Sequence, residues 1–182
     1  MATFNNDEGK GTYEDDWETD LEKSGKIIGR FDPKTDIIVH VIDQSRGISR
    51  DFSCSKEKVM TKMRYFQSYF NGSHMIEDLD ISVHCDVYVF EWLVRFLMAP
   101  TEPKLVLKSV ISILISAEFL GIDDLVEKCL VYVTKHLEEV IRLPIDMSCL
   151  NQSILDRLEA KVNLAELATL RDPKDKLTGK MY

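Results

Sequence analysis

Residues 110–133 read VISILISAEFLGIDDLVEKCLVYV, and this stretch predicts two amphipathic helices that meet at a sharp corner. Apolar residues recur at helical spacing on both sides of that corner. Gly121 readily adopts the left-handed conformation that ends a helix, and Asp123 is the predicted N-cap of the second helix. Two joined helices with such broad apolar faces require burial, so we expect them at the centre of a core. Taken alone, the pattern indicates a helical hairpin, which occurs in many folds.

The composition limits the classes of function. The net charge of −8 disfavours direct nucleic-acid binding, which depends on clustered Lys and Arg. There is no run of 18 apolar residues, so no membrane span is predicted, and the acidic N-terminus lacks the apolar core of a secretory signal. The four cysteines lie far apart, in or beside apolar runs, which predicts buried free thiols in a reducing compartment. We expect an intracellular protein, in the nucleus or the cytoplasm.

The rest of the chain predicts one domain with appendages. Residues 1–25 are polar and acidic, which indicates a disordered leader; residues 26–141 form the domain, and residues 142–182 form a helical extension and polar tail. Three strands allow only a small sheet, so the fold class is α+β, a small β-sheet flanked by a helical cluster. The predicted strands span residues 37–42, 48–54 and 79–84, and the first of them is an apolar run that we expect to be buried on both faces. Outside the hairpin, we predict two short helices in residues 56–70, capped by Ser55, and one helix over residues 87–97, capped by Asp86. Another helix is predicted after Asn151.

No catalytic signature is present in the sequence. It contains neither a phosphate-binding glycine loop nor a G-x-S-x-G nucleophile elbow, and no His and Cys residues have zinc-site spacing. His84 and Cys85 are neighbours in a predicted strand, where adjacent side chains point to opposite faces. We therefore predict a protein that is not an enzyme and that uses no cofactor or metal.

One cation has an unusual position. Lys56 is in the first turn of a predicted helix, where a positive charge opposes the helix dipole. Asp36 directly precedes the first predicted strand. If the fold brings them together, they form an ion pair; the alternative is two unrelated charges facing solvent.

Several motifs together resemble a BTB/POZ domain over roughly residues 36–137. The opening motifs are Asp36-Ile-Ile-Val-His-Val, Phe52-x-Cys54-x-Lys56 and Tyr65-Phe66-x-x-x-Phe70. Phe90-x-x-Leu93-Val94-x-Phe96-Leu97 resembles the third helix of that fold, and Ala117-x-x-Leu120-x-Ile122-x-x-Leu125-Val126-x-x-Cys129 resembles its closing helical pair.

Within this family, the sequence is most similar to the BTB domain of the SANT and BTB domain regulators of class switch recombination. We identify it as a divergent relative in which no SANT module is visible. The motifs that carry this similarity are Ile38-Val-His-Val, Asp51-Phe-x-Cys54, Met63-x-Tyr65-Phe66, Asp80-Ile-Ser-Val-His-Cys-Asp86 and Ile111-Ser-Ile-Leu-Ile-Ser116.

The sequence departs from the usual BTB pattern at three places. Ser55 stands where most members have His, and Met98-Ala99-Pro100 replaces the usual Tyr-Thr-Gly. In the signature of cullin-ligase adaptors, Trp92 of Phe90-Glu91-Trp92 replaces an acidic residue.

The resemblance implies a homodimer built mainly by the first helix and the strand-one region. Residues 59–70 also carry more Met and aromatic side chains than two short helices bury, which is typical of interfaces; the alternative is that all of them pack inside one protomer. The resemblance further makes Asp36 and Lys56 a charged pocket, and the helix with Phe90, Trp92 and Phe96 a candidate partner-binding helix. The expected dimer-interface residues are Ile38, Val59, Met60, Met63 and Phe66.

We therefore predict a non-catalytic protein–protein interaction module that homodimerises and scaffolds partners, such as corepressors, in transcriptional or chromatin-linked regulation. The alternatives are a substrate adaptor for a cullin-type ubiquitin ligase and a structural subunit of a larger assembly.

Overall fold

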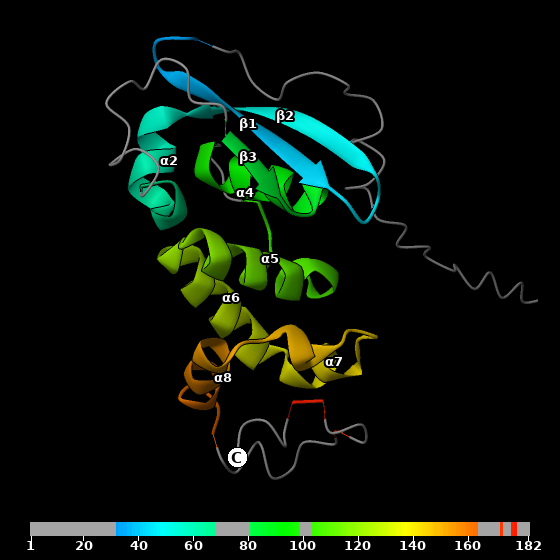
Figure 1. Ribbon diagram of the computed structural model, residues 1–182. Coiled ribbons are helices and arrows are strands. Elements are labelled where there is room, and N and C mark those ends of the chain that lie inside the picture. Colours follow the sequence, from blue (N-terminus) through cyan, green and yellow to red (C-terminus); the bar gives the residue numbers. More distant parts are fainter. Residues whose placement is uncertain (1–31, 68–80, 99–102, 164–171, 173–175, 178–182) are drawn as a thin grey trace, which may run out of the picture.

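The computed structural model describes residues 32–67, 81–98, 103–163, 172 and 176–177 (Figure 1). The expected disordered leader, the end of the second short helix at Phe70 and much of the polar tail lie outside these residues. In the described part of the chain, no helix is long and apolar enough to cross a membrane.

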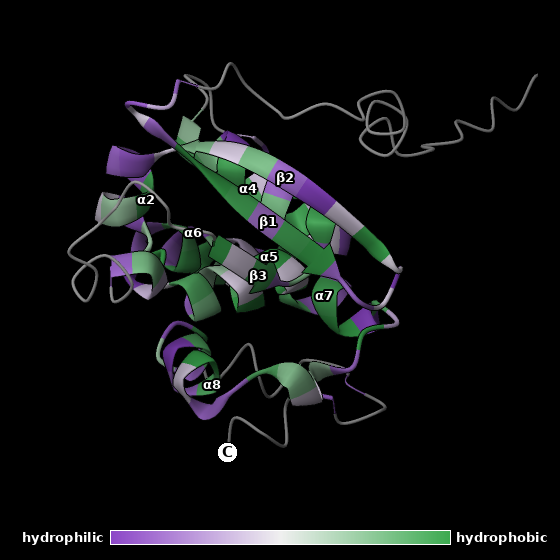
Figure 2. Ribbon diagram, turned by 45° about the horizontal axis from the view of Figure 1, so that its top comes forward, coloured by the Kyte–Doolittle hydropathy of each residue, from purple (hydrophilic) through white to green (hydrophobic). Residues whose placement is uncertain are grey.

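The described strands form a three-stranded mixed sheet in the order β2-β1-β3. β1 (Asp36–Asp43) pairs antiparallel with β2 (Ile48–Ser55) and parallel with β3 (Ile81–His84). In β1, buried and half-buried residues alternate, so the prediction of a strand buried on both faces was wrong. The sheet has one covered face, and Ile38, His40 and Ile42 lie on the other. Figure 2 shows that β2 is more hydrophilic than β1.

The helices form successive layers below the sheet (Figure 1). Ser55 caps the helix that begins at Lys56 by accepting from Lys58 N, and Asp86 caps the helix that begins at Val87 by accepting from Tyr88 N and Val89 N, both as predicted. Asp123 is not an N-cap; Ile122 has that position, and Asp123 lies in the first turn. In chain order the elements are α2 (Lys56–Lys62), a helical stretch from residue 64, α4 (Val87–Met98), α5 (Leu107–Leu120), α6 (Asp123–Lys135), α7 (Leu137–Arg142), η1 (Met147–Cys149) and α8 (Gln152–Glu159).

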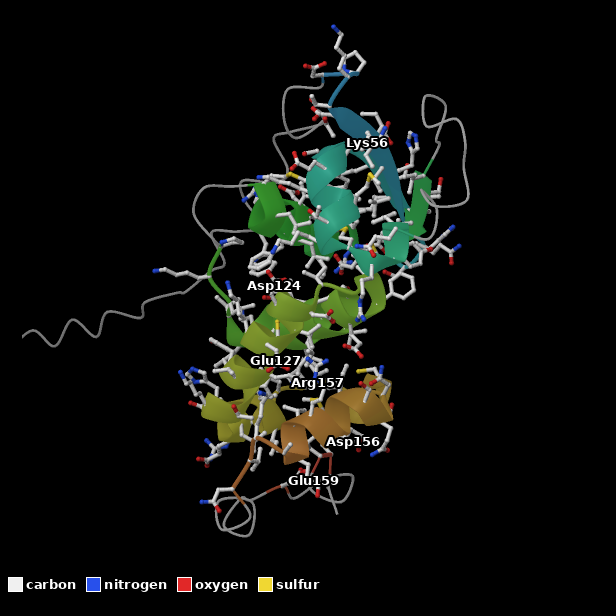
Figure 3. All side chains as sticks on the ribbon, turned by 90° about the vertical axis from the view of Figure 1, so that its left-hand side faces the viewer. Lys56, Asp124, Glu127, Asp156, Arg157 and Glu159 are labelled. Carbon is white, nitrogen blue, oxygen red and sulfur yellow. The ribbon has the colours of Figure 1, made fainter. Side chains whose placement is uncertain are left out.

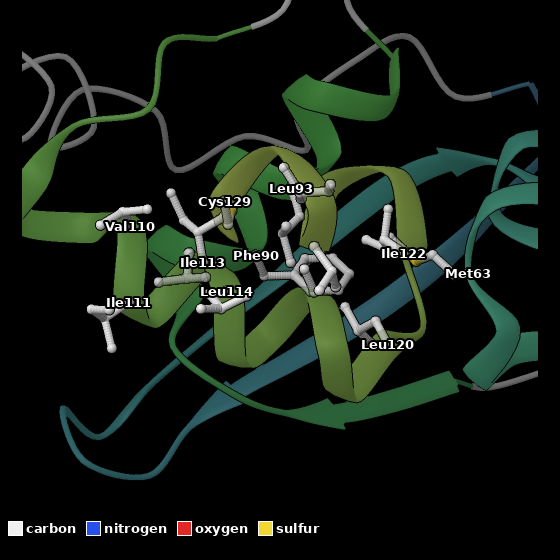
Figure 4. Close-up of a cluster of buried hydrophobic side chains, with 14 of the residues drawn as sticks. Met63, Phe90, Leu93, Val110, Ile111, Ile113, Leu114, Leu120, Ile122 and Cys129 are labelled. Atoms are coloured by element: carbon white, nitrogen blue, oxygen red, sulfur yellow. The ribbon is translucent and has the colours of Figure 1, made fainter. Parts of the chain in front are cut away.

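The core lies between the sheet and the α5–α6 hairpin, with α4 in the middle. Phe90 of α4 packs on Phe52 of β2, with ring centroids 5.1 Å apart. Figure 4 shows Phe90 and Leu93 close to Leu114 of α5, with Cys129 of α6 in the same cluster. The α5–α6 hairpin is therefore central to the core, as predicted.

The C-terminal extension is attached to the domain by apolar packing, since Ile154, Leu155 and Leu158 of α8 are buried in the same core cluster, and by charges. Asn151 caps α8, as predicted, by accepting from Ile154 N. Arg157 of α8 contacts Glu127 of α6 (Figure 3). Arg157 also contacts Glu118 of α5, and Lys161 contacts Glu127. Hydrogen bonds from Arg157 and Lys161 lower the pKa of Glu127. The extension is thus docked on α5 and α6.

Gly121 joins the hairpin to the first helical unit. Its φ of 71° ends α5 in the left-handed conformation. A Cβ at this position would lie 2.8 Å from Cβ of Arg64, which is closer than carbon atoms can pack. The carbonyl of Gly121 accepts from Arg64 N at 3.5 Å, and the guanidinium of Arg64 reaches Asp123 at 2.8 Å. Two separate constraints, dihedral angle and space, therefore require glycine at this corner.

Gly47 provides a matched control for this corner. Its φ is 67°, but a Cβ there would meet nothing within 4 Å. Gly47→Ala should cost about 1–2 kcal/mol of unfolding free energy, the usual cost of a left-handed alanine. Gly121→Ala should cost at least ~1 kcal/mol more because of the contact with Arg64. Equal losses in urea unfolding experiments would show that the corner has room for a methyl group.

Candidate interaction surface

The structure separates the predicted dimer residues into two groups. Val59, Met63 and Phe66 are buried in the core of the protomer, with 1% or less of each residue exposed. Ile38 and Met60 are half-buried and remain accessible at the surface. The three buried residues therefore pack inside one protomer, which was the alternative to a place in the interface. A dimer interface stays a prediction, with Ile38 and Met60 as its accessible members.

Those two residues belong to elements that are tied together at their starts. The backbone N–H of Lys56, the first residue of α2, donates to the carbonyl of Thr35 at 2.9 Å, directly before β1. Asp36 pairs in register with Ser55, the N-cap of α2. The start of α2 therefore lies beside the start of β1 at this end of the sheet.

The predicted charged pocket has a different arrangement from the expected one. The carboxylate of Asp36 accepts hydrogen bonds from Asp32 N, Thr35 Oγ1 and Ser53 Oγ at 3.1–3.3 Å. Within the described residues, no ion pair joins Asp36 to Lys56, although the two lie close along the pairing of β1 with β2. Local turn and strand polar groups satisfy Asp36 instead.

A charged cluster that the sequence did not predict lies at the opposite end of β1. Asp43 is only 3% exposed, and its carboxylate accepts from Ser45 Oγ at 2.6 Å and from Arg46 Nη1 at 2.8 Å. The same guanidinium nitrogen lies 2.6 Å from Asp86, the cap of α4. The bond from Ser45, together with those from Arg46, holds the pKa of Asp43 well below its usual range, although burial acts in the opposite sense. The turn after β1 is thereby fastened to the start of α4.

Glu91 extends this cluster along α4. It is 2% exposed, and its carboxylate contacts Arg95 at 2.7 Å and Arg50 of β2 at 3.4 Å. The guanidinium groups of Arg46 and Arg50 lie 5.3 and 5.4 Å from the ring centroid of Tyr88. A buried carboxylate is stable only when it is paired, so these arginines are required by the fold. The one available signal was a charged residue in the otherwise apolar run Val87–Val94, and it did not identify the partners.

An open groove of about 320 Å³ adjoins the cluster, between α4 and the start of α5. Its cations are Arg46, Arg95, Lys104 and Lys108, and its carboxylates are Asp86 and Glu91, which pair with Arg46 and with Arg95. We call it the basic groove.

The candidate partner-binding helix is α4, and its three residues have different roles. Phe90 is fully buried and serves the core. Trp92 and Phe96 are half-buried and stack with ring centroids 5.8 Å apart, and Lys128 Nζ lies 5.0 Å from the ring centroid of Phe96. Trp92 also lines the basic groove. Of the three residues, Trp92 and Phe96 can contact a partner in this conformation, whereas Phe90 cannot.

The four thiols are free, but they are not all buried as predicted. Cys54 and Cys129 are buried, Cys85 is half-buried, and Cys149 is exposed in η1. Burial raises the pKa of Cys54, Cys85 and Cys129 to about 12. Within the described residues, no three His, Cys, Asp or Glu side chains are grouped so that they could hold a metal ion.

The described fold is that of a BTB-type domain. It has a small mixed sheet, a central helix α4 and a closing helical hairpin. Residues 37–130 match the family model described as the SANT and BTB domain regulator of CSR, BTB domain. The chain belongs to this family. BTB domains are protein–protein interaction modules, and the functional residues of such a module are those on its surface.

Asp43→Asn tests the buried cluster. The lowered pKa means that the Asp43 carboxylate stabilises the fold at any pH above the pKa of the unfolded carboxyl, about 3.9, and that this stabilisation disappears as the pH falls further. The variant should lose about 2 kcal/mol of unfolding free energy at pH 7, as for other buried bonds to a charged group, and the loss should shrink below about pH 4. Asp124→Asn, in a surface ion pair with Lys62, should change little at either pH. A pH-independent loss for Asp43→Asn in urea unfolding would contradict the assignment.

Alkylation of the native protein tests the thiol environments. Cys149 should react first with iodoacetamide at pH 8, because it is exposed whereas burial and a pKa of about 12 keep Cys54 and Cys129 protonated. All four should react in guanidinium chloride. Peptide mass spectrometry over time measures the order, and equal rates for Cys54 and Cys149 in the native protein would contradict this burial.

Proposed function

We propose that this domain is a self-associating scaffold, which forms a symmetric homodimer and holds two copies of its bound partners side by side. The interface consists of the outer face of β1 around Ile38 and the surface of α2 around Met60. The family description names a regulator, which supports a regulatory role for the dimer. A place for that role in transcription or at chromatin is part of the proposal.

One observation supports this proposal above all. Two apolar side chains, Ile38 and Met60, remain half-exposed on elements that the bond from Lys56 N to Thr35 O joins at their starts. A two-fold interface uses the same patch on both copies, so one such patch is sufficient to build a dimer. Methionine is also enriched at protein interfaces, where its flexible side chain adapts to a partner surface.

The alternative role as a cullin adaptor has less support from the geometry. Its signature corresponds to Phe90-Glu91-Trp92, in which the phenyl ring is in the core and the carboxylate is buried between Arg50 and Arg95. These two side chains have no surface to present to a cullin. Self-association is therefore the function that the arrangement supports best.

Met60→Glu is the test, because a charge at a half-buried position on α2 should be tolerated by the monomer but not in an interface. The wild-type chain should elute as a dimer of twice 21.0 kDa in light scattering at micromolar concentration, and Met60→Glu should elute as a monomer. Circular dichroism should show both to be folded. Met63→Glu is unsuitable, because that side chain is fully buried and a charge there would unfold the protomer.

Val131→Glu is the matched control. Val131 is an apolar residue on α6 with 40% exposure, outside the proposed interface. It should leave the dimer intact. A wild-type monomer at every concentration would overturn the proposal, and a dimer that Val131→Glu alone dissociates would move the interface to α6.

A further inference from the structure

The basic groove between α4 and α5 has a charge that contrasts with the rest of the domain. Residues 23–182 carry 23 carboxylates and 22 Lys or Arg, so they are close to neutral. The described residues that line the groove include four cations, Arg46, Arg95, Lys104 and Lys108, and two carboxylates, Asp86 and Glu91, and both lysines are exposed at its rim. The groove is therefore a local positive site, which attracts an anionic ligand.

The same groove also offers apolar contacts. Trp92 and Val106 line it, and Val106 is 43% exposed, which makes it one of the three large apolar side chains exposed in the described residues. No acidic residue lies in the first turn of α5, which borders the groove. A ligand that combines carboxylates with an aromatic side chain matches both features, because the lysines attract the charges and Trp92 and Val106 can pack on a ring.

The chain itself contains such a segment. Residues 13–20 read Tyr-Glu-Asp-Asp-Trp-Glu-Thr-Asp, with five carboxylates and two aromatic rings. Residues 1–22 as a whole carry eight carboxylates and one lysine, so almost all of the net charge of −8 resides there. None of the residues proposed for the dimer interface belongs to this acidic segment.

We propose that residues 13–20 bind in the basic groove of the same chain. The carboxylates of the segment face Lys104 and Lys108, and an aromatic ring packs beside Trp92 and Val106. An acidic partner that uses this groove must then displace the segment, so the intramolecular contact regulates access to it.

The distances permit the contact. β1 has eight residues and is about 26 Å long, which separates its start near Asp32 from the turn that holds Arg46. Residues 21–31 connect the acidic segment to that start, and eleven extended residues span up to about 37 Å. A tether of this length gives the segment an effective concentration of the order of millimolar, so even weak attraction occupies the groove.

The two tryptophans of the chain report on the two sides of the contact. Trp17 lies in the acidic segment and Trp92 in the groove, and each contributes one indole N–H signal to the ¹⁵N–¹H NMR spectrum of the full chain. The combined substitution Glu14→Gln, Asp15→Asn and Asp16→Asn should shift the Trp92 signal. Lys104→Glu with Lys108→Glu should shift the Trp17 signal. In the wild-type protein, 0.5 M NaCl should move both signals towards their positions in these variants, because salt screens the attraction.

Lys135→Glu is the control, since Lys135 is exposed on α6 and does not line the groove. It should shift neither indole signal. The proposal fails if the Trp92 signal is unchanged when the three carboxylates are removed and the Trp17 signal is unchanged when the two lysines are reversed. It also fails if both shifts appear only at high protein concentration, since the groove would then bind the segment of a second copy. The same variants made in the Met60→Glu background, in which the chain should be a monomer, separate a contact within one copy from a contact between the copies of a dimer.

Discussion

The close approach of Gly121 to Arg64 is the constraint on which the arrangement of this domain depends. It places the corner of the α5–α6 hairpin against the helical stretch that follows α2, with 2.8 Å between the Cβ of Arg64 and the place a Cβ would take on residue 121. The hairpin also packs on α4 and, through Arg157, on α8. One corner therefore positions the elements that carry the candidate surfaces, and the left-handed φ of Gly121 makes it a sharp one.

Buried ion pairs fix the position of α4 at the end of the sheet where β1 turns into β2. Asp43 and Glu91 are almost inaccessible, and their arginine partners connect the β1–β2 turn and β2 to α4. Paired charges of this kind contribute little net stability compared with apolar packing, but losing one partner is costly, so they favour one orientation of α4 over others. That orientation forms one wall of the basic groove and leaves Trp92 and Phe96 at the surface. The proposed self-association and the proposed binding of an acidic segment thus involve opposite ends of β1.

Patterns along the chain predicted the fold well, because its elements are set by local chemistry. Alternation identified β2 and β3, Gly121 identified the corner, and Ser55, Asp86 and Asn151 identified three helix starts. Predictions that depend on contacts between residues far apart in the sequence were less accurate. Burial of Met63 and Phe66 depends on the hairpin that covers them, and Glu91 finds Arg50 41 positions away. The interface residues could not be chosen from the sequence, because the same types of apolar residue occur in the core and at an interface.

Self-association through β1 and α2 is the central claim, and intermolecular nuclear Overhauser effects test it most directly. If one batch of protein is perdeuterated except for its ¹³C-labelled methionine methyls and is mixed with unlabelled protein, isotope-filtered cross-peaks from those methyls arise only between copies. We expect cross-peaks from the Met60 methyl group to the partner copy, and none from Met63, which is enclosed within the protomer. The absence of any cross-peak from Met60 at millimolar concentration would contradict the claim.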